Sequence, residues 1–233
     1  MSNVFYFLGR PDGLGNRVEE LIKIQEYCER HGRKCIYIWQ NTSFRNYSIS
    51  IEFEHIEIRT SISAEERKLL SKNEFQRTFN YNVKYNFNFS VDNDLKYDTI
   101  VHIRATDRVV QNNHKDFSTV EMLDSFIDKT IQYINNDDTI STYTIVTDDS
   151  RLKERLLVGV NKKYVDLLYN CDVEKDWLDF YYLTKPQKYV IMCSQFSSYS
   201  ICASILGNKK LMVFRNSLKS NLPRYKANLG FID

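Results

Sequence analysis

Short apolar runs alternate with amphipathic segments along most of this chain, and this alternation restricts the fold more than any other feature. Residues 4–8 form an apolar run, residues 17–31 repeat apolar side chains at helical spacing, and residues 35–39 form a second apolar run. The turn-rich residues 9–16 precede the helical segment, and Gly32 is placed to end it. A strand, a helix and a strand in this order predict a βαβ unit, which requires parallel strands and a right-handed crossover.

The second half of the chain repeats the alternation. Five apolar runs are predicted as strands there: residues 97–103, 143–146, 164–168, 189–193 and 211–214. Helical spacing follows each of the first four runs, at residues 119–133, 150–157, 177–184 and 199–206. The whole pattern predicts an α/β protein made of two small Rossmann-like domains. Their joint is expected near residues 90–97, which divides the chain into domains 1–95 and 96–233.

Three other stretches give less information. Residues 49–58 alternate and predict one or two strands, and residues 63–66 have the form of a helix start with a capping box. Residues 73–95 are rich in Asn, Phe and Tyr with weak alternation, and they give no assignment. The run at residues 211–214 is predicted to be the last strand.

Composition excludes several classes of protein. Hydrophobic residues make up 42% of the 233 residues and charged residues 27%, which is ordinary for a soluble globular protein. The net charge of +2, without a basic block, gives no support for nucleic acid as a partner. No apolar run approaches a transmembrane span, so a cytoplasmic protein is expected, with peripheral membrane association left open. Five cysteines without a CxxC pair predict reduced thiols and no metal site.

Charged side chains crowd the end of the predicted strand at residues 97–103. His102, Arg104 and Asp107 lie there within six positions of one another. In open α/β sheets, ligands bind at the carboxyl ends of the strands. An arginine at such a position can clamp a phosphate with two charge-assisted hydrogen bonds. The alternative is a strand end whose charges are simply solvated.

Polar residues follow three further strands. They are Gly13, Gly15 and Asn16 before the first helix, Asp148 and Asp149 after the run at residues 143–146, and Ser197 and Ser198 before the last helix. The glycines let a ligand approach a helix N-terminus, the acids suit ribose hydroxyls, and the serine hydroxyls suit a diphosphate. The alternative for each group is local structure, which means a turn for the glycines and helix capping for the acids and serines.

The order and spacing of these motifs resemble the fucosyltransferase superfamily, the GT-B enzymes that include α-1,6-, α-1,2- and protein O-fucosyltransferases. The motifs are Gly13-Leu-Gly-Asn16, His102-Ile-Arg-Ala-Thr-Asp107, Thr147-Asp-Asp149 and Phe196-Ser-Ser198. The resemblance implies a GT-B-like fold whose two Rossmann-like domains have parallel sheets facing a central cleft. It also implies inverting, metal-independent transfer of fucose from GDP-fucose to a glycan or glycoconjugate acceptor, such as a surface polysaccharide, with no cofactor.

The resemblance assigns roles to the candidate residues. Arg104 would bind the donor β-phosphate, and His102 and Asp179 would contact the guanine, with Asp176 as a rival to Asp179. The rest of the donor site would be Asp107, the first glycine motif (Gly13, Gly15 and Asn16), Asp148 and Asp149 near the nucleotide, and Ser197 and Ser198 on phosphate oxygens.

Two departures from the family pattern leave alternatives open. Ala105 stands where many of these enzymes carry a second arginine, so another nucleotide-sugar donor or a non-catalytic nucleotide-sugar-binding module is the alternative function. The acceptor's proton would go to His114 or Asp116, although both could equally be exposed loop residues. A Rossmann-type dehydrogenase fits poorly, because the motif Gly13-Leu-Gly15 lacks the third glycine.

Overall fold

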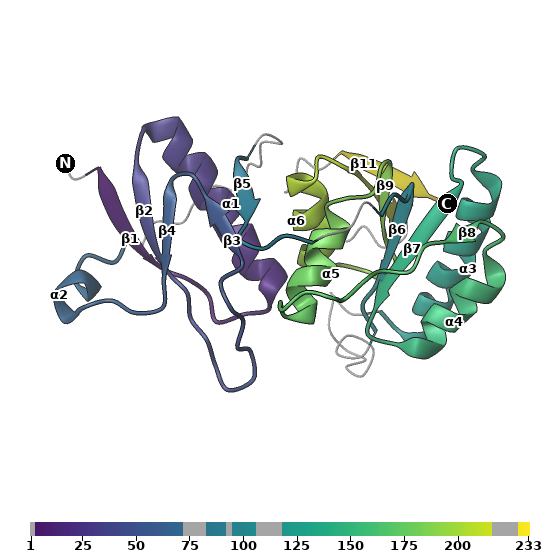
Figure 1. Cartoon of the computed structure of the whole chain (residues 1–233), viewed down its shortest axis with the longest axis horizontal. Coiled ribbons are helices and arrows are strands. Elements are labelled where there is room, and N and C mark those ends of the chain that lie inside the picture. Colours follow the sequence, from purple (N-terminus) through teal and green to yellow (C-terminus); the bar gives the residue numbers. More distant parts are fainter. Residues whose placement is uncertain (1–2, 72–82, 92–94, 106–117, 216–227) are drawn as a thin grey trace.

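The chain folds into two β-sheets that lie side by side along the long axis of the molecule, with helices packed on them (Figure 1). The computed structural model describes residues 3–71, 83–91, 95–105, 118–215 and 228–233. Strands before residue 88 build the first sheet and strands after residue 98 build the second. The predicted α/β class is confirmed, and the predicted boundary at residues 95 and 96 falls in the connection between the sheets.

The first sheet is parallel over three strands and antiparallel at one edge. Its strands, in spatial order, are β1 (Val4–Leu8), β2 (Lys34–Ile38), β4 (Ile56–Arg59), β3 (Ile51–Phe53) and β5 (Tyr85–Phe87). Helix α1 (Leu14–His31) joins β1 to its parallel neighbour β2, so the predicted βαβ unit is confirmed. Gly32 ends α1 with a φ of 59°, a left-handed conformation that glycine adopts without steric cost. The short helix α2 (Ala64–Arg67) begins at the predicted capping box.

The second sheet is parallel throughout. Its strands, in spatial order, are β11 (Leu229–Ile232), β10 (Lys210–Phe214), β9 (Tyr189–Met192), β6 (Thr99–Ile103), β7 (Thr142–Thr147) and β8 (Lys163–Tyr164). The connecting helices are α3 (Val120–Asn136), α4 (Ser150–Gly159), α5 (Lys175–Leu183) and α6 (Ser198–Leu206). The chain starts this sheet in its middle at β6 and winds outward in both directions. Open sheets of this kind bind ligands where the winding reverses, which is here beside the ends of β6 and β9.

Two strands lie outside the periodic pattern of the sequence. Strand β10 is not the last one, contrary to the prediction, because β11 adds to the sheet edge and pairs Met212 with Gly230. A four-residue edge strand that contains a glycine carries no alternation to recognise. Strand β5 lies in the stretch without assignment, and its order comes from antiparallel pairing with β3.

Helix α1 of the first sheet packs directly against α6 of the second. Gly15 makes this contact possible, because a Cβ atom there would lie 2.5 Å from the backbone nitrogen of Tyr199 and 2.7 Å from its Cα atom. The Gly15 carbonyl also accepts a weak hydrogen bond from the buried thiol of Cys202, at 3.6 Å. One buried core therefore runs through both halves of the molecule.

Two tryptophans add a second contact between the halves. Trp39, after β2, stacks on Trp177 of α5 with ring centroids 6.2 Å apart, and both side chains are buried. The Trp177 indole donates a hydrogen bond to the Ser48 carbonyl at 2.9 Å, and the Ser48 amide donates to the Glu174 carboxylate at 2.9 Å. These contacts fix the orientation of one sheet relative to the other.

We expect Gly15→Ala to lower the free energy of unfolding by about 1–3 kcal/mol, because the added methyl group forces α1 away from α6. Urea denaturation followed by circular dichroism measures the change. Gly13→Ala is the matched control, since the nearest atom to a Cβ there is the Arg45 Nη1 at 3.8 Å. Equal effects of the two substitutions would contradict the close-packing role of Gly15.

Candidate functional site

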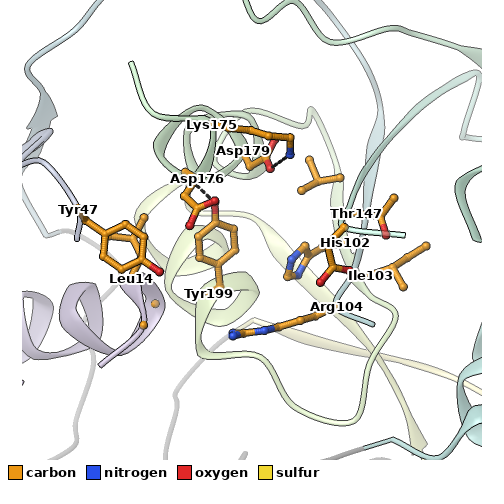
Figure 2. Close-up of a pocket in the computed structure, with 14 residues that line it drawn as sticks. Leu14, Tyr47, His102, Ile103, Arg104, Thr147, Lys175, Asp176, Asp179 and Tyr199 are labelled. Atoms are coloured by element: carbon orange, nitrogen blue, oxygen red, sulfur yellow. Dashed lines mark hydrogen bonds and ion pairs between the residues drawn. The ribbon is translucent and has the colours of Figure 1, made fainter. Parts of the chain in front are cut away.

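A pocket of about 270 Å³ lies where the two halves meet, at the carboxyl ends of β6 and β7 (Figure 2). Its lining comes from both halves: Gly13, Leu14, Gly15 and Tyr47 from the first, and His102, Ile103, Arg104, Val146, Thr147, Asp148, Lys175, Asp176, Asp179 and Tyr199 from the second. The pocket thus lies at the carboxyl edge of the second sheet, where open α/β sheets bind ligands, and it borders β6, beside which the winding reverses. Three of the predicted motifs contribute to its wall, namely those at residues 13–16, 102–107 and 147–149.

Arg104 follows β6 directly, and its side chain reaches into the pocket beside Tyr199 (Figure 2). Every residue of β6 is buried, and the strand pairs with β7 on one side and β9 on the other, so the arginine follows directly on a strand held from both sides. Its positive charge acts on Tyr47 of the first half and on His102 of the same strand. A half-buried guanidinium in this position suits an anionic ligand.

His102 is a neutral ring at the inner end of the pocket. Its Nδ1 atom lies 2.6 Å from the Ser200 Oγ atom, and its ring centroid lies 5.3 Å from that of Tyr199. Burial lowers the pKa of His102 to about 3, and the positive charge of Arg104 acts in the same direction. The ring can therefore offer one N–H donor and one acceptor at neutral pH, and it adds no charge to the pocket.

The two acids after β7 have different surroundings. Asp148 lines the pocket and accepts a hydrogen bond from the Ala105 amide at 3.0 Å, which fixes the chain just beyond Arg104. Asp149 is the N-cap of α4 instead, where its carboxylate accepts from the Arg151 and Leu152 amides and pairs with the Arg151 guanidinium. Helix capping, the alternative considered for these acids, is thus the observed role of Asp149, and it does not line the pocket.

Helix α5 contributes three charged side chains to the pocket. The Asp179 carboxylate is buried and accepts hydrogen bonds from the Tyr169 hydroxyl at 2.6 Å and from the Lys175 ammonium at 2.5 Å. Asp176 lies one turn earlier, and its carboxyl group faces Tyr47 of the first half. Loss of water around the carboxyl raises the pKa of Asp176, and the negative charge of Asp179 raises it further.

The sequence predicts anion sites at the N-termini of α1 and α6, and only some of their residues line the pocket. Gly13 and Gly15 line it, whereas Asn16 does not, and the missing side chain of Gly15 serves the packing on α6. Ser197 is buried and caps α6 by accepting from the Ser200 amide, and Ser198 is buried beside Gly15. Neither serine lines the pocket. The phosphate contacts expected of these two serines therefore remain predictions, as do the nucleotide contacts of Asn16 and Asp149.

Three candidate residues lie outside the described residues: Asp107, His114 and Asp116. Seven pocket residues were in turn not among the candidates: Leu14, Tyr47, Ile103, Val146, Thr147, Lys175 and Tyr199. Tyr199 and Lys175 are neighbours in sequence of the candidates Ser198 and Asp176. Tyr47 has no such signal, because it reaches the pocket from the first half of the chain through tertiary contacts.

The buried cation of Arg17 holds the segment that carries Tyr47. Its guanidinium donates to the Asn41 side chain at 2.9 Å and to the Arg45 carbonyl at 3.0 Å, and it lies 4.8 Å from the ring centroid of Trp39 and 5.1 Å from that of Tyr47. A charged side chain this deep is stabilised only by such contacts. Tyr47 is therefore a fixed part of the pocket wall.

Within the part of the chain that the structure describes, one group of side chains could meet at a single cation: Glu29, Glu54 and His55. They belong to the first half of the chain, and none of them lines the pocket. No helix among the described residues is long and apolar enough to cross a membrane.

We expect Asp149→Ala to lower the free energy of unfolding by about 1 kcal/mol, because α4 loses its cap. The ion pair with Arg151 lowers the pKa of Asp149 below its ordinary value of 3.8. The stabilisation is therefore present above pH 3.8 and is lost as the pH falls through the folded-state pKa. Urea denaturation at pH 7 and at pH 3 tests this, and a difference from wild type that is the same at both pH values would contradict it.

No protein-family model matches the sequence, and no curated protein matches it. Solved structures do match in fold. The structure of NodZ α-1,6-fucosyltransferase soaked with GDP-fucose aligns with a TM-score of 0.50 and 11% identity, over 88% of this chain and 93% of that one. Fucosyltransferase NodZ from Bradyrhizobium aligns with a TM-score of 0.50 and 12% identity, over 88% and 92%. The predicted GT-B-like arrangement of two Rossmann-like units is thus confirmed, and the chain has a fucosyltransferase-like fold.

Proposed function

We propose that this protein is a glycosyltransferase that transfers fucose from GDP-fucose to a glycan or glycoconjugate acceptor, with inversion and without a metal ion. One observation carries the proposal: Arg104 stands in a pocket at the carboxyl edge of the second sheet, in a fold shared with fucosyltransferases. The pocket takes residues from both halves, so a donor and an acceptor can meet there.

Arg104 is the proposed partner of the donor diphosphate. When the sugar leaves, negative charge builds on the β-phosphate, and a guanidinium fixed at the end of a buried strand can stabilise that charge without first reorganising. The N-terminus of α1 lines the opposite side of the pocket with Gly13 and Leu14, and its dipole favours an anion there. Together these two groups take the part that a divalent cation plays in other transferases.

The guanine end of the donor is proposed to lie toward α5 and β7. The neutral His102 ring and the Asp179 carboxylate are polar groups fixed by partners from the protein, and Asp148 lies beside them. Such fixed groups lose little conformational entropy on binding, which favours a specific nucleobase. Asp107 is proposed to belong to this site as well.

The surroundings of Ala105 favour a second candidate function, a nucleotide-sugar-binding module or a transferase with another donor. Ala105 is 4% exposed in the core of the second sheet, and its amide is bonded to Asp148. A second guanidinium at this position would have to displace core side chains. Donor contacts that a neighbouring arginine would supply must therefore come from elsewhere in the pocket.

A nucleotide comparison separates these functions. We expect GDP to raise the melting temperature of the protein, and UDP and CMP to leave it unchanged, because the proposed site holds a guanine. Release of GDP from GDP-fucose then distinguishes an enzyme from a binding module. Stabilisation by UDP or CMP alone would mean that the donor carries that nucleotide in place of GDP. Stabilisation by none of the three would reject both functions.

We expect Arg104→Ala to abolish release of GDP from GDP-fucose and to weaken GDP binding at least tenfold, because the diphosphate loses a charge-assisted fork of hydrogen bonds. Its melting temperature without nucleotide should stay near that of wild type, since the side chain lines a pocket. Arg30→Ala is the matched control, because it removes an exposed guanidinium from the last turn of α1, the end remote from the pocket. Unchanged activity of Arg104→Ala would disprove the phosphate clamp.

A further inference from the structure

Inverting transfer requires a base that receives the acceptor's proton on the side of the sugar opposite the leaving diphosphate. Three carboxylates line the pocket among the described residues: Asp148, Asp176 and Asp179. Asp148 holds the Ala105 amide, and Asp179 is buried between Tyr169 and Lys175. Asp148 and Asp176 are both exposed, and Asp176 is the one that faces the first half of the molecule, from which an acceptor can approach.

Asp176 and Arg104 lie on different walls of the pocket, with the Tyr199 ring between them (Figure 2). Both residues are held by the elements that carry them, Arg104 by the buried strand β6 and Asp176 by α5. The Tyr199 hydroxyl donates a hydrogen bond to the Asp176 carbonyl, and the next residue, Trp177, is buried in the contact between the two halves. With the diphosphate on Arg104 and the guanine beside His102 and Asp179, the space left for the sugar lies toward Tyr47 and Asp176 (Figure 2).

Tyr47 completes the arrangement from the first half. Figure 2 places its side chain beside Asp176, where the hydroxyl lowers the pKa of the Asp176 carboxyl, and the Arg17 guanidinium lies 5.1 Å from the centroid of the Tyr47 ring. The charged form of Asp176 is thus favoured by a hydroxyl that belongs to the opposite half of the molecule.

We propose, on the basis of the function proposed above, that Asp176 is the general base of the transfer and that Tyr47 is a positioning residue that orients it. In the step, the acceptor O–H proton moves to the Asp176 carboxylate while the acceptor oxygen bonds to the anomeric carbon. The bond from that carbon to the donor phosphate oxygen breaks, and its electron pair leaves with the diphosphate on Arg104. Water can replace the acceptor, in which case free sugar and GDP form.

The surroundings of Asp176 make its carboxylate a stronger base than an ordinary aspartate. The groups that face it are Lys175, Glu174 and Asp179 of α5, Tyr47 of the first half, Tyr199 of α6 and, across the pocket, Arg104. Desolvation and Asp179 raise the pKa of Asp176, while Lys175 and the Tyr47 hydroxyl oppose them. The rate should accordingly fall as the pH drops through this raised pKa and the carboxylate becomes protonated.

The test compares Asp176→Asn with the wild-type chain, using release of GDP from GDP-fucose and calorimetric binding of GDP. We expect the rate to fall about 100-fold or more, with the GDP affinity within about threefold of wild type, because the amide cannot accept a proton. Asp172→Asn, an exposed carboxylate just before α5, is the matched control and should keep full activity. Retained GDP binding also shows that the variant is folded.

Three results would overturn the assignment. An unchanged rate in Asp176→Asn would exclude a proton transfer, and an equal loss of rate and GDP affinity would make Asp176 a nucleotide contact. A wild-type protein that binds GDP but releases none from GDP-fucose would be a binding module without a base. Failure of the proposed function looks different, since the wild-type protein would then bind no GDP at all.

Tyr47→Phe distinguishes positioning from a structural role. Removing the hydroxyl removes a group that lowers the pKa of Asp176, so the acidic limb of the pH–rate profile should move to higher pH. The rate well above that limb should fall less than in Asp176→Asn, because the base is still present. A limb that stays in place would mean that Tyr47 does not act on the base.

Discussion

The contact between α1 and the backbone of α6 is the constraint on which the rest of the molecule depends. Because residue 15 is a glycine, the N-terminal turn of α1 can rest on Tyr199, and the first sheet is brought to the carboxyl edge of the second. The pocket is the space left beside this contact. A larger residue would separate the helices and would remove one wall of the site together with a part of the core.

The contacts around this junction also decide how firmly the pocket is built. Trp39 stacks on Trp177 across the junction, and the buried Arg17 lies against Trp39. These contacts hold the segment that carries Tyr47 in a fixed position relative to the junction. The charged groups of the pocket are positioned by the elements that carry them. Arg104, for example, follows directly on the buried strand β6. A site with such mountings can favour a charge-separated transition state without the cost of moving its own dipoles.

The sequence predicts the frame of this structure well and the pocket in part. Alternation of strands and helices gives the βαβ unit and the parallel second sheet, and the position of Arg104 after β6 follows from the strand that precedes it. Capping motifs are harder to interpret, because Asp149 and Ser197 have the side chains of ligands and serve as helix caps. Tyr47 and the edge strand β11 owe their places to partners far along the chain, which no local pattern records.

In the proposed function, the diphosphate of a nucleotide sugar rests on Arg104. A crystal structure with bound GDP measures this directly. We expect β-phosphate oxygen atoms within about 3 Å of the Arg104 guanidinium nitrogens, the usual distance for a charge-assisted hydrogen bond, beside the N-terminus of α1. A nucleotide bound at another place, or one whose phosphates point away from Arg104, would contradict it.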